Sequence, residues 1–212
     1  MTTTRHGRAC GFTLIELLIV ISILGVLAAV LVPNLIGAND AASEAATEAN
    51  MIVLENGIKT HERKHGFAPP DDLKPVAADA KAPWKPDNGR NTGIESLVCF
   101  LSNSLQDGVD LGGMANAFTN TDADDHGVEM PLLKSRERRE IADGFTTPMA
   151  YFGKFGLGKT QTMLLGVDGE QAAVKAMLRP DGKPFGDGKW QILSAGKDRT
   201  FGTADDLAWP KN

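Results

Sequence analysis

Apolar residues fill the chain from Leu17 to Asn39, a stretch without a charged residue. A bilayer's hydrocarbon core of about 30 Å needs roughly 20 apolar residues of helix, so this segment can span a membrane. One carboxylate, Glu16, directly precedes it, and an ionisable group beside such a span is costly enough to be interpreted as functional. Arg5 and Arg8 lie on the N-terminal side and favour a cytoplasmic N-terminus. Everything beyond the span is then extracytoplasmic.

The pattern beyond the span predicts that the same helix continues. Pro33 interrupts the apolar run and is expected to kink or locally open the helix. After it, small apolar residues recur at a spacing of three to four and predict the packed face of an amphipathic helix: Ala38, Ala42, Ala45, Ala49 and Ile52. Gly66 and Pro69-Pro70 end the pattern. One helix from Phe12 to His65 would be about 80 Å long.

The remaining pattern predicts an α+β domain with an antiparallel sheet. Residues 67–93 favour an irregular connection, followed by a short helix, Gly93 to Asn103, with Thr92 as its N-cap. Residues 104–140 are polar and loop-like. Strands are predicted at Met149 to Phe152, Thr162 to Val167 and Lys189 to Leu193, and Gln171 to Leu178 fits a strand or a helical turn.

Length, composition and charge limit the number of domains and the possible partners. The chain has 212 residues, enough for one domain beside the anchor, and its formal net charge is −5. It has no basic block of the kind that binds nucleic acid, so no nucleic-acid partner is expected.

The N-terminal residues support a named resemblance. Gly11-Phe12-Thr13-Leu14-Ile15-Glu16, followed by the apolar run, resembles the class III signal of type IV pilins and type II secretion pseudopilins. The resemblance implies that a prepilin peptidase cuts between Gly11 and Phe12 on the cytoplasmic face and methylates Phe12. It also implies that Glu16 pairs with the N-terminal ammonium of a neighbouring subunit during assembly, a pairing favoured at low dielectric. Cleavage discards Cys10, and the remaining Cys99 is expected to be a buried small hydrophobe without a disulfide partner.

Two later segments resemble the secretion branch. Residues 143–148 lie where major pseudopilins carry an Asp, an aromatic residue, Gly and Pro before a strand, with Thr146 where the glycine is expected. The tail, residues 194–206, resembles the major pseudopilin's calcium loop. By that resemblance Asp198, Asp205 and Asp206 bind Ca²⁺ together with backbone carbonyls near Ala195 and Lys197. The alternative is a polar turn without an ion.

The resemblance therefore implies a pilin-like α+β fold, a long N-terminal helix packed on a small antiparallel sheet with a C-terminal loop. The expected parts are a prepilin leader (1–11), a transmembrane and assembly helix (12–33), an extracytoplasmic amphipathic helix (34–65) and a periplasmic globular domain (66–212). The expected protein is a non-enzymatic, single-pass inner-membrane subunit of a type II secretion pseudopilus. Its expected partners are identical and related pseudopilins in a helical filament, the prepilin peptidase and the membrane proteins of the secretion platform.

Two other functions remain open. A type IV pilin or minor pilin, acting in adhesion, motility or DNA uptake, shares the N-terminal pattern. An anchored periplasmic metallohydrolase would use His61-Glu62-Arg63-Lys64-His65, which satisfies the zinc motif H-E-x-x-H. Its charged intervening residues and the immediate Gly66 favour an exposed helix end instead.

Two further motifs also have simpler interpretations. Residues 153–160 satisfy the phosphate-loop pattern G-x-x-x-x-G-K-T, but glycines interrupt the next segment, so a glycine-rich hairpin is expected. Asn120, Asp122, Asp124 and Asp125 alternate like the start of a calcium loop, but the sixth position is not glycine and Pro131 occupies the twelfth. A solvated acidic loop is expected there.

Overall fold

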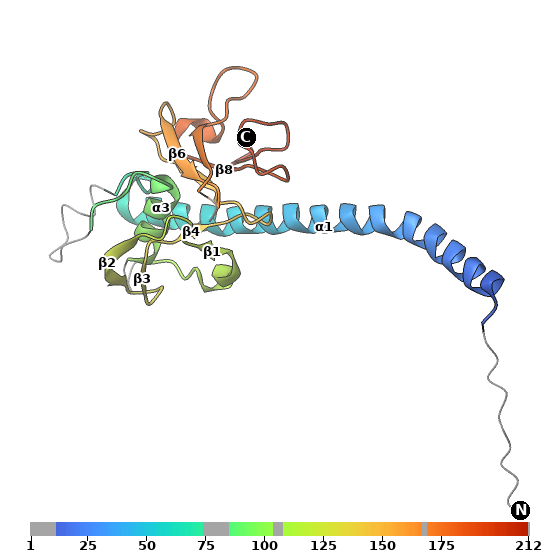
Figure 1. The fold of residues 1–212 in the computed structure, drawn as a ribbon. Helices are drawn as coiled ribbons and strands as arrows, with labels where there is room; N and C mark the ends of the chain where they lie inside the picture. The colour runs from blue at the N-terminus through green and yellow to red at the C-terminus, as the bar shows by residue number, and fades with distance from the viewer. Residues whose placement is uncertain (1–11, 74–84, 104–107, 167–168, 212) are drawn as a thin grey trace, which may run out of the picture. The chain divides into compact units, whose positions relative to one another are not determined.

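The computed structural model describes residues 12–73, 85–103, 108–166 and 169–211 (Figure 1). Its longest element is α1, Leu14–His65, with 52 residues. The chain divides into two compact units, Met1–Ala41 and Ala42–Asn212, so α1 contributes to both. The continuous helix predicted from Phe12 to His65 is confirmed to within two residues.

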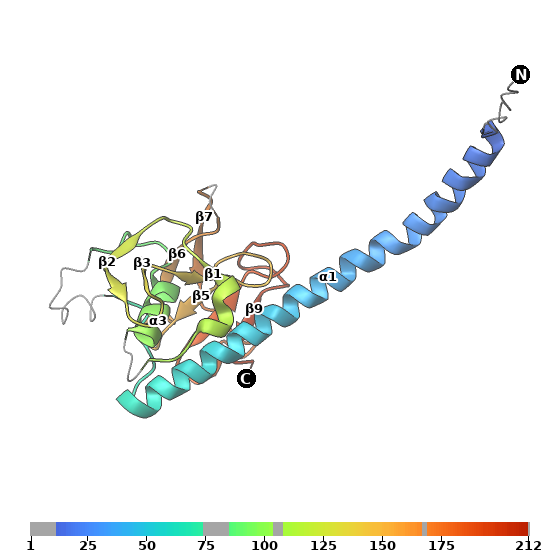
Figure 2. The same cartoon turned by 90° about the horizontal axis from the view of Figure 1, so that it is seen from below.

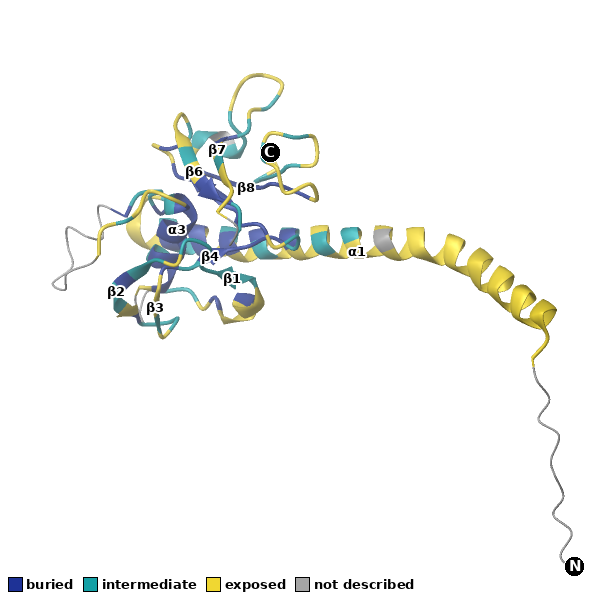
Figure 3. Ribbon diagram, viewed as in Figure 1, coloured by how far each residue is buried: buried dark blue, intermediate teal, exposed yellow. Residues whose placement is uncertain are grey.

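The first unit contains the apolar part of α1. This is the one helix in the described part of the chain that is long and apolar enough to cross a membrane, and none of its most apolar window is buried (Figure 3). The helix continues through Pro33 without a break. The side-chain amide of Asn34 donates a hydrogen bond of 3.0 Å to the carbonyl of Val30, one turn earlier. A helix satisfies its own backbone groups, which is what hydrocarbon requires.

In the second unit, α1 buries a different face from the predicted one. The buried side chains follow one another at spacings of three and four: Thr47, Met51, Leu54, Ile58 and His61. Ala42, Ala45 and Ala49 are exposed, and Ile52 is 45% exposed. The prediction of an alanine face was wrong because large side chains remove more apolar area from water than alanine does. The larger residues therefore determine which face packs against the domain.

The second helix, α3, spans Thr92–Ser102 and packs against this buried face (Figure 2). Its apolar residues Ile94, Leu97, Val98 and Leu101 are buried, as the predicted helical face requires. The residue before the helix is Asn91, in a left-handed conformation. Thr92 is therefore not the N-cap, and its hydroxyl donates to the Asp87 carboxylate at 2.6 Å instead.

Among the described residues, the strands form four small antiparallel sheets, as the predicted α+β class requires. Three sheets have two strands: β1 (Phe118–Thr119) with β4 (Glu140–Ile141), β2 (Asp125–Met130) with β3 (Ser135–Glu137), and β6 (Thr160–Leu164) with β7 (Gln171–Lys175). The fourth places β8 (Gln191–Ser194) between β5 (Ala150–Phe152) and β9 (Leu207–Trp209). Short 3₁₀ turns occur at η1 (Gly112–Ala117) and η2 (Gly186–Gly188). The main core joins α1, α3, β4, β5 and β8, which is the helix-on-sheet packing of a pilin-like fold.

The prediction of a loop over residues 104–140 was wrong for its described part, residues 108–140, which contains η1 and the strands β1, β2 and β3 and reaches β4. These strands contain few apolar residues. The buried side chains of this segment include His126 on β2, Glu140 on β4 and Arg138 between β3 and β4, each at most 1% exposed. Strand prediction relies on apolar alternation, so a strand that buries polar groups escapes it.

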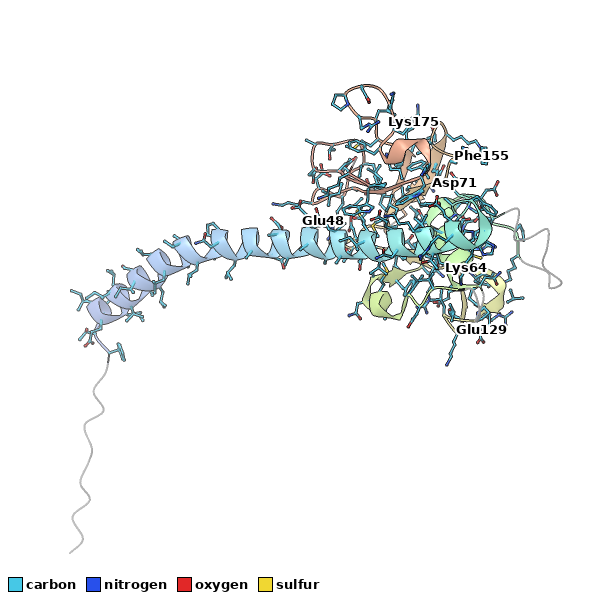
Figure 4. The ribbon with its side chains drawn as sticks, turned by 180° about the vertical axis from the view of Figure 1, so that it is seen from behind. Glu48, Lys64, Asp71, Glu129, Phe155 and Lys175 are labelled. Atoms are coloured by element: carbon cyan, nitrogen blue, oxygen red, sulfur yellow. The ribbon has the colours of Figure 1, made fainter. Side chains whose placement is uncertain are left out.

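The C-terminal strand returns to α1. The indole N–H of Trp209 donates to the Glu55 carboxylate at 2.9 Å, and Lys211 forms an ion pair with Glu48, which lies on α1 (Figure 4). The loop between β8 and β9, residues 195–206, is thus held at both ends, by the central strand of a sheet and by a strand fixed to the helix.

Cys99 lies on α3 and is fully buried beside Leu73 and Met130. Burial raises the pKa of its thiol to about 12. The expectation of a buried, apolar cysteine is confirmed.

The buried face of α1 gives a first testable prediction. Leu54→Ala should lower the free energy of unfolding by about 2–5 kcal/mol, because it removes a fully buried side chain and leaves a cavity. Denaturant unfolding of the full chain in detergent, followed by tryptophan fluorescence, measures this change. Ile52→Ala, on the exposed face two residues earlier, is the control and should have a much smaller effect. Equal losses in the two variants would contradict the assigned face.

Candidate functional site

Glu16 caps its own helix. Its carboxylate accepts hydrogen bonds from the backbone N–H of Thr13 at 2.8 Å and from the Thr13 hydroxyl at 2.7 Å. The backbone N–H of Glu16 in turn donates to that hydroxyl at 3.3 Å. Threonine followed three residues later by glutamate is a capping-box pattern, a signal that the sequence contains and that the interpretation above did not use. Glu16 therefore has a local role in one chain besides its expected role between chains.

The residues around the expected cleavage site differ in what the structure describes. Phe12 is 82% exposed and lies just before α1. Gly11 and the leader 1–11 lie outside the described residues. Cleavage before Phe12, its methylation and the intersubunit pairing of Glu16 stay predictions.

Asp143 organises the loop that resembles the pseudopilin motif. One of its carboxylate oxygens accepts hydrogen bonds from the backbone N–H groups of Phe145 and Thr147, both at 2.9 Å. The other accepts one from the Ser194 hydroxyl, at the end of β8, at 2.6 Å. Ser194 also accepts from the backbone N–H of Gly196 at 3.1 Å. This buried carboxylate thereby connects its own loop to the start of the tail loop.

The same loop touches α1 at Gly144, whose backbone N–H donates to the Thr47 hydroxyl at 2.9 Å. A Cβ atom on Gly144 would lie 2.0 Å from the carbonyl oxygen of Ser43, closer than any side chain permits. Glycine is therefore required by close approach at this position.

Thr146 follows with φ of +69°, in the left-handed region that a β-branched residue rarely adopts. This explains why a glycine is expected at this position, and Thr146 departs from that pattern at a cost in backbone strain.

The tail loop, residues 195–206, contains the three aspartates predicted to bind calcium. Asp205 accepts hydrogen bonds from the Thr203 hydroxyl at 2.6 Å and from the backbone N–H of Asp198 at 3.0 Å, and these bonds lower its pKa. Asp206 accepts one from the backbone N–H of Gly202 at 2.7 Å, while partial burial raises its pKa. Asp198 bonds to the backbone N–H of Thr200 at 2.8 Å. The carboxylates therefore close the loop through amides and a hydroxyl.

The loop brings the aspartates into one segment but does not gather them tightly. In the described residues, sets of three ligand atoms within 4.8 Å of one another occur among other carboxylates, not among these three. Gly196 takes φ of +64°, and a Cβ there would lie 2.3 Å from the carbonyl oxygen of Asp205. The two ends of the loop therefore approach each other closely at Gly196. Calcium binding by this loop stays a prediction.

The H-E-x-x-H motif lies at the end of α1. His61 is buried, and its ring contacts that of the exposed His65 with the ring centroids 4.3 Å apart and the ring planes tilted by 32°. Burial, followed by the charges of His65 and Lys64, lowers the pKa of His61 to about 4. Within the described residues no third ligand lies close enough to complete a set with these histidines. The geometry gives the zinc interpretation no support.

The phosphate-loop pattern forms a turn-rich connection and not the expected hairpin, because β5 pairs with β8 whereas β6 pairs with β7. It joins β5 to β6, so a strand follows it rather than a helix. Gly153 and Gly156 pack against the segment around Asp71 (Figure 4), where a Cβ on Gly156 would lie 1.4 Å from an Asp71 carboxylate oxygen. Close packing explains these glycines without a nucleotide.

The expectation of a solvated acidic loop at residues 120–125 was wrong for two of its aspartates. Asp124 forms a 2.8 Å ion pair with the buried Arg138, and only 14% of the Asp124 side chain is exposed. One carboxylate oxygen of Asp122 is buried without a hydrogen-bond partner. Asp125 alone matches the expectation, because it pairs with Lys85 near the surface.

Comparison with known proteins agrees with the N-terminal pattern. A family profile described as a prokaryotic N-terminal methylation motif matches residues 7–32. The type II secretion system core protein G of Dickeya chrysanthemi is 34% identical over 84 residues, which cover 40% of this chain and 54% of that protein. The protein of the same name from Escherichia coli K12 is 31% identical over 88 residues, covering 42% and 60%.

A type IV wide pilus major component from Thermus thermophilus is 50% identical over 55 residues, covering 26% of this chain and 40% of that protein. The chain spans about half the length of the curated relatives it matches. No solved structure matches it significantly.

The N-terminal segment matches a prokaryotic N-terminal methylation motif, and the described residues combine a long apolar helix with an α+β domain. The relatives named type II secretion system core protein G agree with the resemblance to the G-type pseudopilin inferred from the sequence.

The strained loop gives a second prediction. Thr146→Gly should raise the free energy of unfolding by about 0.5–1 kcal/mol, because relief of a left-handed conformation outweighs glycine's greater freedom in the unfolded chain. Thermal or denaturant unfolding of the full chain checks the sign. Thr146→Ala keeps a Cβ in the same conformation and should give no such gain. A loss of stability in Thr146→Gly would contradict the strain argument.

Proposed function

We propose that this protein is a structural subunit of a type II secretion pseudopilus, which assists protein export across the outer membrane. The observation that carries the proposal is the methylation motif over residues 7–32, with Glu16 at its expected place before an uninterrupted apolar helix. The relatives named type II secretion system core protein G support the secretion branch. The role is mechanical rather than enzymatic.

The anchoring helix supports a specific arrangement in the cell. A prepilin peptidase would cut between Gly11 and Phe12 and methylate Phe12. The helix would then hold the subunit in the inner membrane, with its N-terminus in the cytoplasm and its globular domain in the periplasm, as Arg5 and Arg8 favour. Identical and related pseudopilins and the membrane proteins of the secretion platform would be its partners.

Assembly would exchange the partner of Glu16. In one chain its carboxylate accepts hydrogen bonds from Thr13, next to the new N-terminus at Phe12. In a filament, the ammonium of a neighbouring Phe12 would offer a full opposite charge in a low-dielectric environment, where such a pair is strongly favoured. The capping geometry holds the carboxylate at the very start of the helix, where an incoming N-terminus would meet it.

The rival function, a type IV pilin, is favoured by the Thermus relative alone among the comparisons described above. The tail loop favours secretion, because it offers three aspartates where type IV pilins commonly carry a cystine. Cys99 is buried on α3 and distant in sequence from the tail loop.

We also propose that the tail loop binds calcium through Asp198, Asp205 and Asp206. Ca²⁺ takes 6–8 oxygen ligands, so backbone carbonyls near Ala195 and Lys197 would add to the carboxylates. The close approach at Gly196 supports this arrangement. The bound ion would replace the amide and hydroxyl partners of these carboxylates and would fix the loop that leads into β9.

A third prediction tests the function. In the source bacterium lacking its own copy, Glu16→Ala and Glu16→Gln should leave cleavage intact but should reduce filament assembly and the export of secreted proteins. Glutamine can still serve in a capping box, so a shared defect would come from the lost charge rather than the lost cap. Mass spectrometry of the protein, electron microscopy of filaments and the amount of protein in the medium give the three measurements.

Two controls make that test specific. Glu44→Ala removes an exposed carboxylate on α1 beyond the apolar run and should assemble normally. Gly11→Trp should block cleavage and separate a processing defect from an assembly defect. Normal filaments from both Glu16 variants would refute the pairing, and loss of surface pili with normal export would support the type IV pilin instead.

A fourth prediction concerns the tail loop. After chelator treatment, the full chain in detergent should be stabilised by added calcium, by about 2.7 kcal/mol when free calcium is 100 times the Kd of one site. Asp205→Ala should remove one bound ion per chain and the corresponding stabilisation.

Asp110→Ala provides the matched control. Asp110 is exposed and accepts a 2.8 Å bond from the backbone N–H of Gly112, the same two-residue pattern that Asp198 makes. It should bind calcium like the parent protein. Unchanged ion binding in Asp205→Ala would refute the tail site and leave the filament function standing.

A further inference from the structure

A group of acidic side chains lies inside the globular unit, away from the tail loop in sequence. We call it the carboxylate cluster, and it consists of Asp87, Glu95, Asp122, Asp124 and Glu140. Glu95 comes from the first turn of α3 and Glu140 from β4. Asp122 and Asp124 lie between β1 and β2, and Asp87 precedes α3. Four separate segments therefore contribute to it.

The cluster contains two overlapping sets of possible metal ligands. One oxygen each from Asp87, Glu95 and Asp124 lie within 4.8 Å of one another, and so do one oxygen each from Glu95, Asp122 and Glu140. Two oxygens bound to one Ca²⁺ at about 2.3–2.6 Å can be separated by up to roughly twice that distance. Both sets have this spacing, and Glu95 belongs to both.

Glu95 is the member whose burial needs an explanation. Its residue is 1% exposed, and neither of its carboxylate oxygens has a hydrogen-bond partner. Burial, followed by the charges of Asp124 and Asp122, raises the pKa of Glu95 to about 11. A buried carboxyl group without a partner is costly in either protonation state, because its polar atoms lose water and gain nothing.

Two neighbouring carboxylates lack a hydrogen-bond partner on one oxygen only. One oxygen of Asp122 and one of Asp124 are also buried without a partner. The second oxygen of Asp122 accepts from the Asn88 side chain at 2.8 Å, and that of Asp124 pairs with Arg138. Each of these two aspartates is thus held by one oxygen while the other has no partner.

Glu140 and Asp87 are oriented by further hydrogen bonds. Glu140 accepts from the side chain of Asn91 at 2.8 Å and from the backbone N–H of Thr121 at 3.0 Å. Asp87 accepts from Thr92 at 2.6 Å and lies 3.4 Å from the Arg138 guanidinium. Outer partners of this kind orient the ligands of metal sites. A single buried guanidinium that contacts two of five carboxylates leaves a large excess of negative charge.

We propose that the carboxylate cluster binds a divalent cation, calcium, with Glu95 as its central ligand. All the candidate ligand atoms are hard oxygens, which favour calcium, magnesium or manganese over zinc or copper. Calcium suits the site best because it accepts many protein oxygens in irregular geometry, whereas magnesium keeps several waters. The ion would give Glu95, Asp122 and Asp124 the partner that their free oxygens lack, and it would tie α3 to β4 and to the β1–β2 connection.

The inference does not depend on the filament function or on the tail loop. A competing explanation needs no ion, because Glu95 could be a neutral acid that shares a proton with a neighbouring carboxylate. The two explanations differ for Glu95→Gln, since glutamine imitates a neutral acid in shape and polarity but gives a cation no charge.

The experiment uses the full chain in detergent, stripped with a chelator and dialysed against calcium chloride in increasing concentration. Asp205→Ala serves as the background, so that the tail loop does not contribute. This protein should bind one calcium ion per chain in the carboxylate cluster. Adding Glu95→Gln should weaken binding by at least about tenfold, since the loss of even an outer partner of a metal ligand costs 10- to 100-fold. Asp122→Asn should act in the same direction.

Glu129→Gln is the control, because Glu129 is exposed on β2 outside the cluster (Figure 4). It should bind calcium like the background protein. Circular dichroism establishes that each variant is folded before its binding is compared. Calcium binding that is absent from the Asp205→Ala background, or that is unchanged by both Glu95→Gln and Asp122→Asn, would overturn the proposal in favour of the shared proton.

Discussion

The placement of the chain's C-terminal half depends on the hydrogen bonds that the Asp143 carboxylate accepts. This carboxylate fixes its own loop through two backbone N–H groups and binds Ser194 at the end of β8. The adjacent Gly144 sets that loop directly on α1, where only glycine fits. One buried acid therefore couples the helix, the central strand of the largest sheet and the start of the tail loop. Burial raises the pKa of Asp143, and its hydrogen bonds offset only part of that rise.

The long helix serves two different environments with two kinds of side chain. In the first unit its apolar residues are exposed all round the helix, as a lipid-facing segment requires. In the second unit it buries the row from Thr47 to His61. The helix itself was predictable because its apolar run and its stop signals are local. Its packed face was not, because alanine and larger residues both recur at helical spacing and only the tertiary partner selects between them.

The same limit explains which site residues could be found from the sequence. Glu16 and the tail aspartates stand in contiguous patterns, so their positions could be named directly. The carboxylate cluster comes from four segments, and two of its members, Asp122 and Asp124, were interpreted as solvated because no nearby residue reveals their burial. Glu95, the one charged residue of α3, was the local anomaly that could have drawn attention to the cluster. Thr146 shows the converse. Its departure from the expected glycine was visible in the sequence, but its strain could be recognised only from the backbone φ angle in the structure.

Cys99 gives the mature domain a practical property. Cleavage before Phe12 would leave it as the single cysteine of the chain, buried beside Leu73 and Met130 with a thiol pKa raised to about 12. Thiol reagents act on exposed thiolates, so this residue is inert to them. Single cysteines placed on the exposed row of Ala42, Ala45 and Ala49 could therefore be crosslinked or labelled in living cells without replacing Cys99. After that cleavage, no native cysteine would need to be replaced before the neighbours of the helix are mapped.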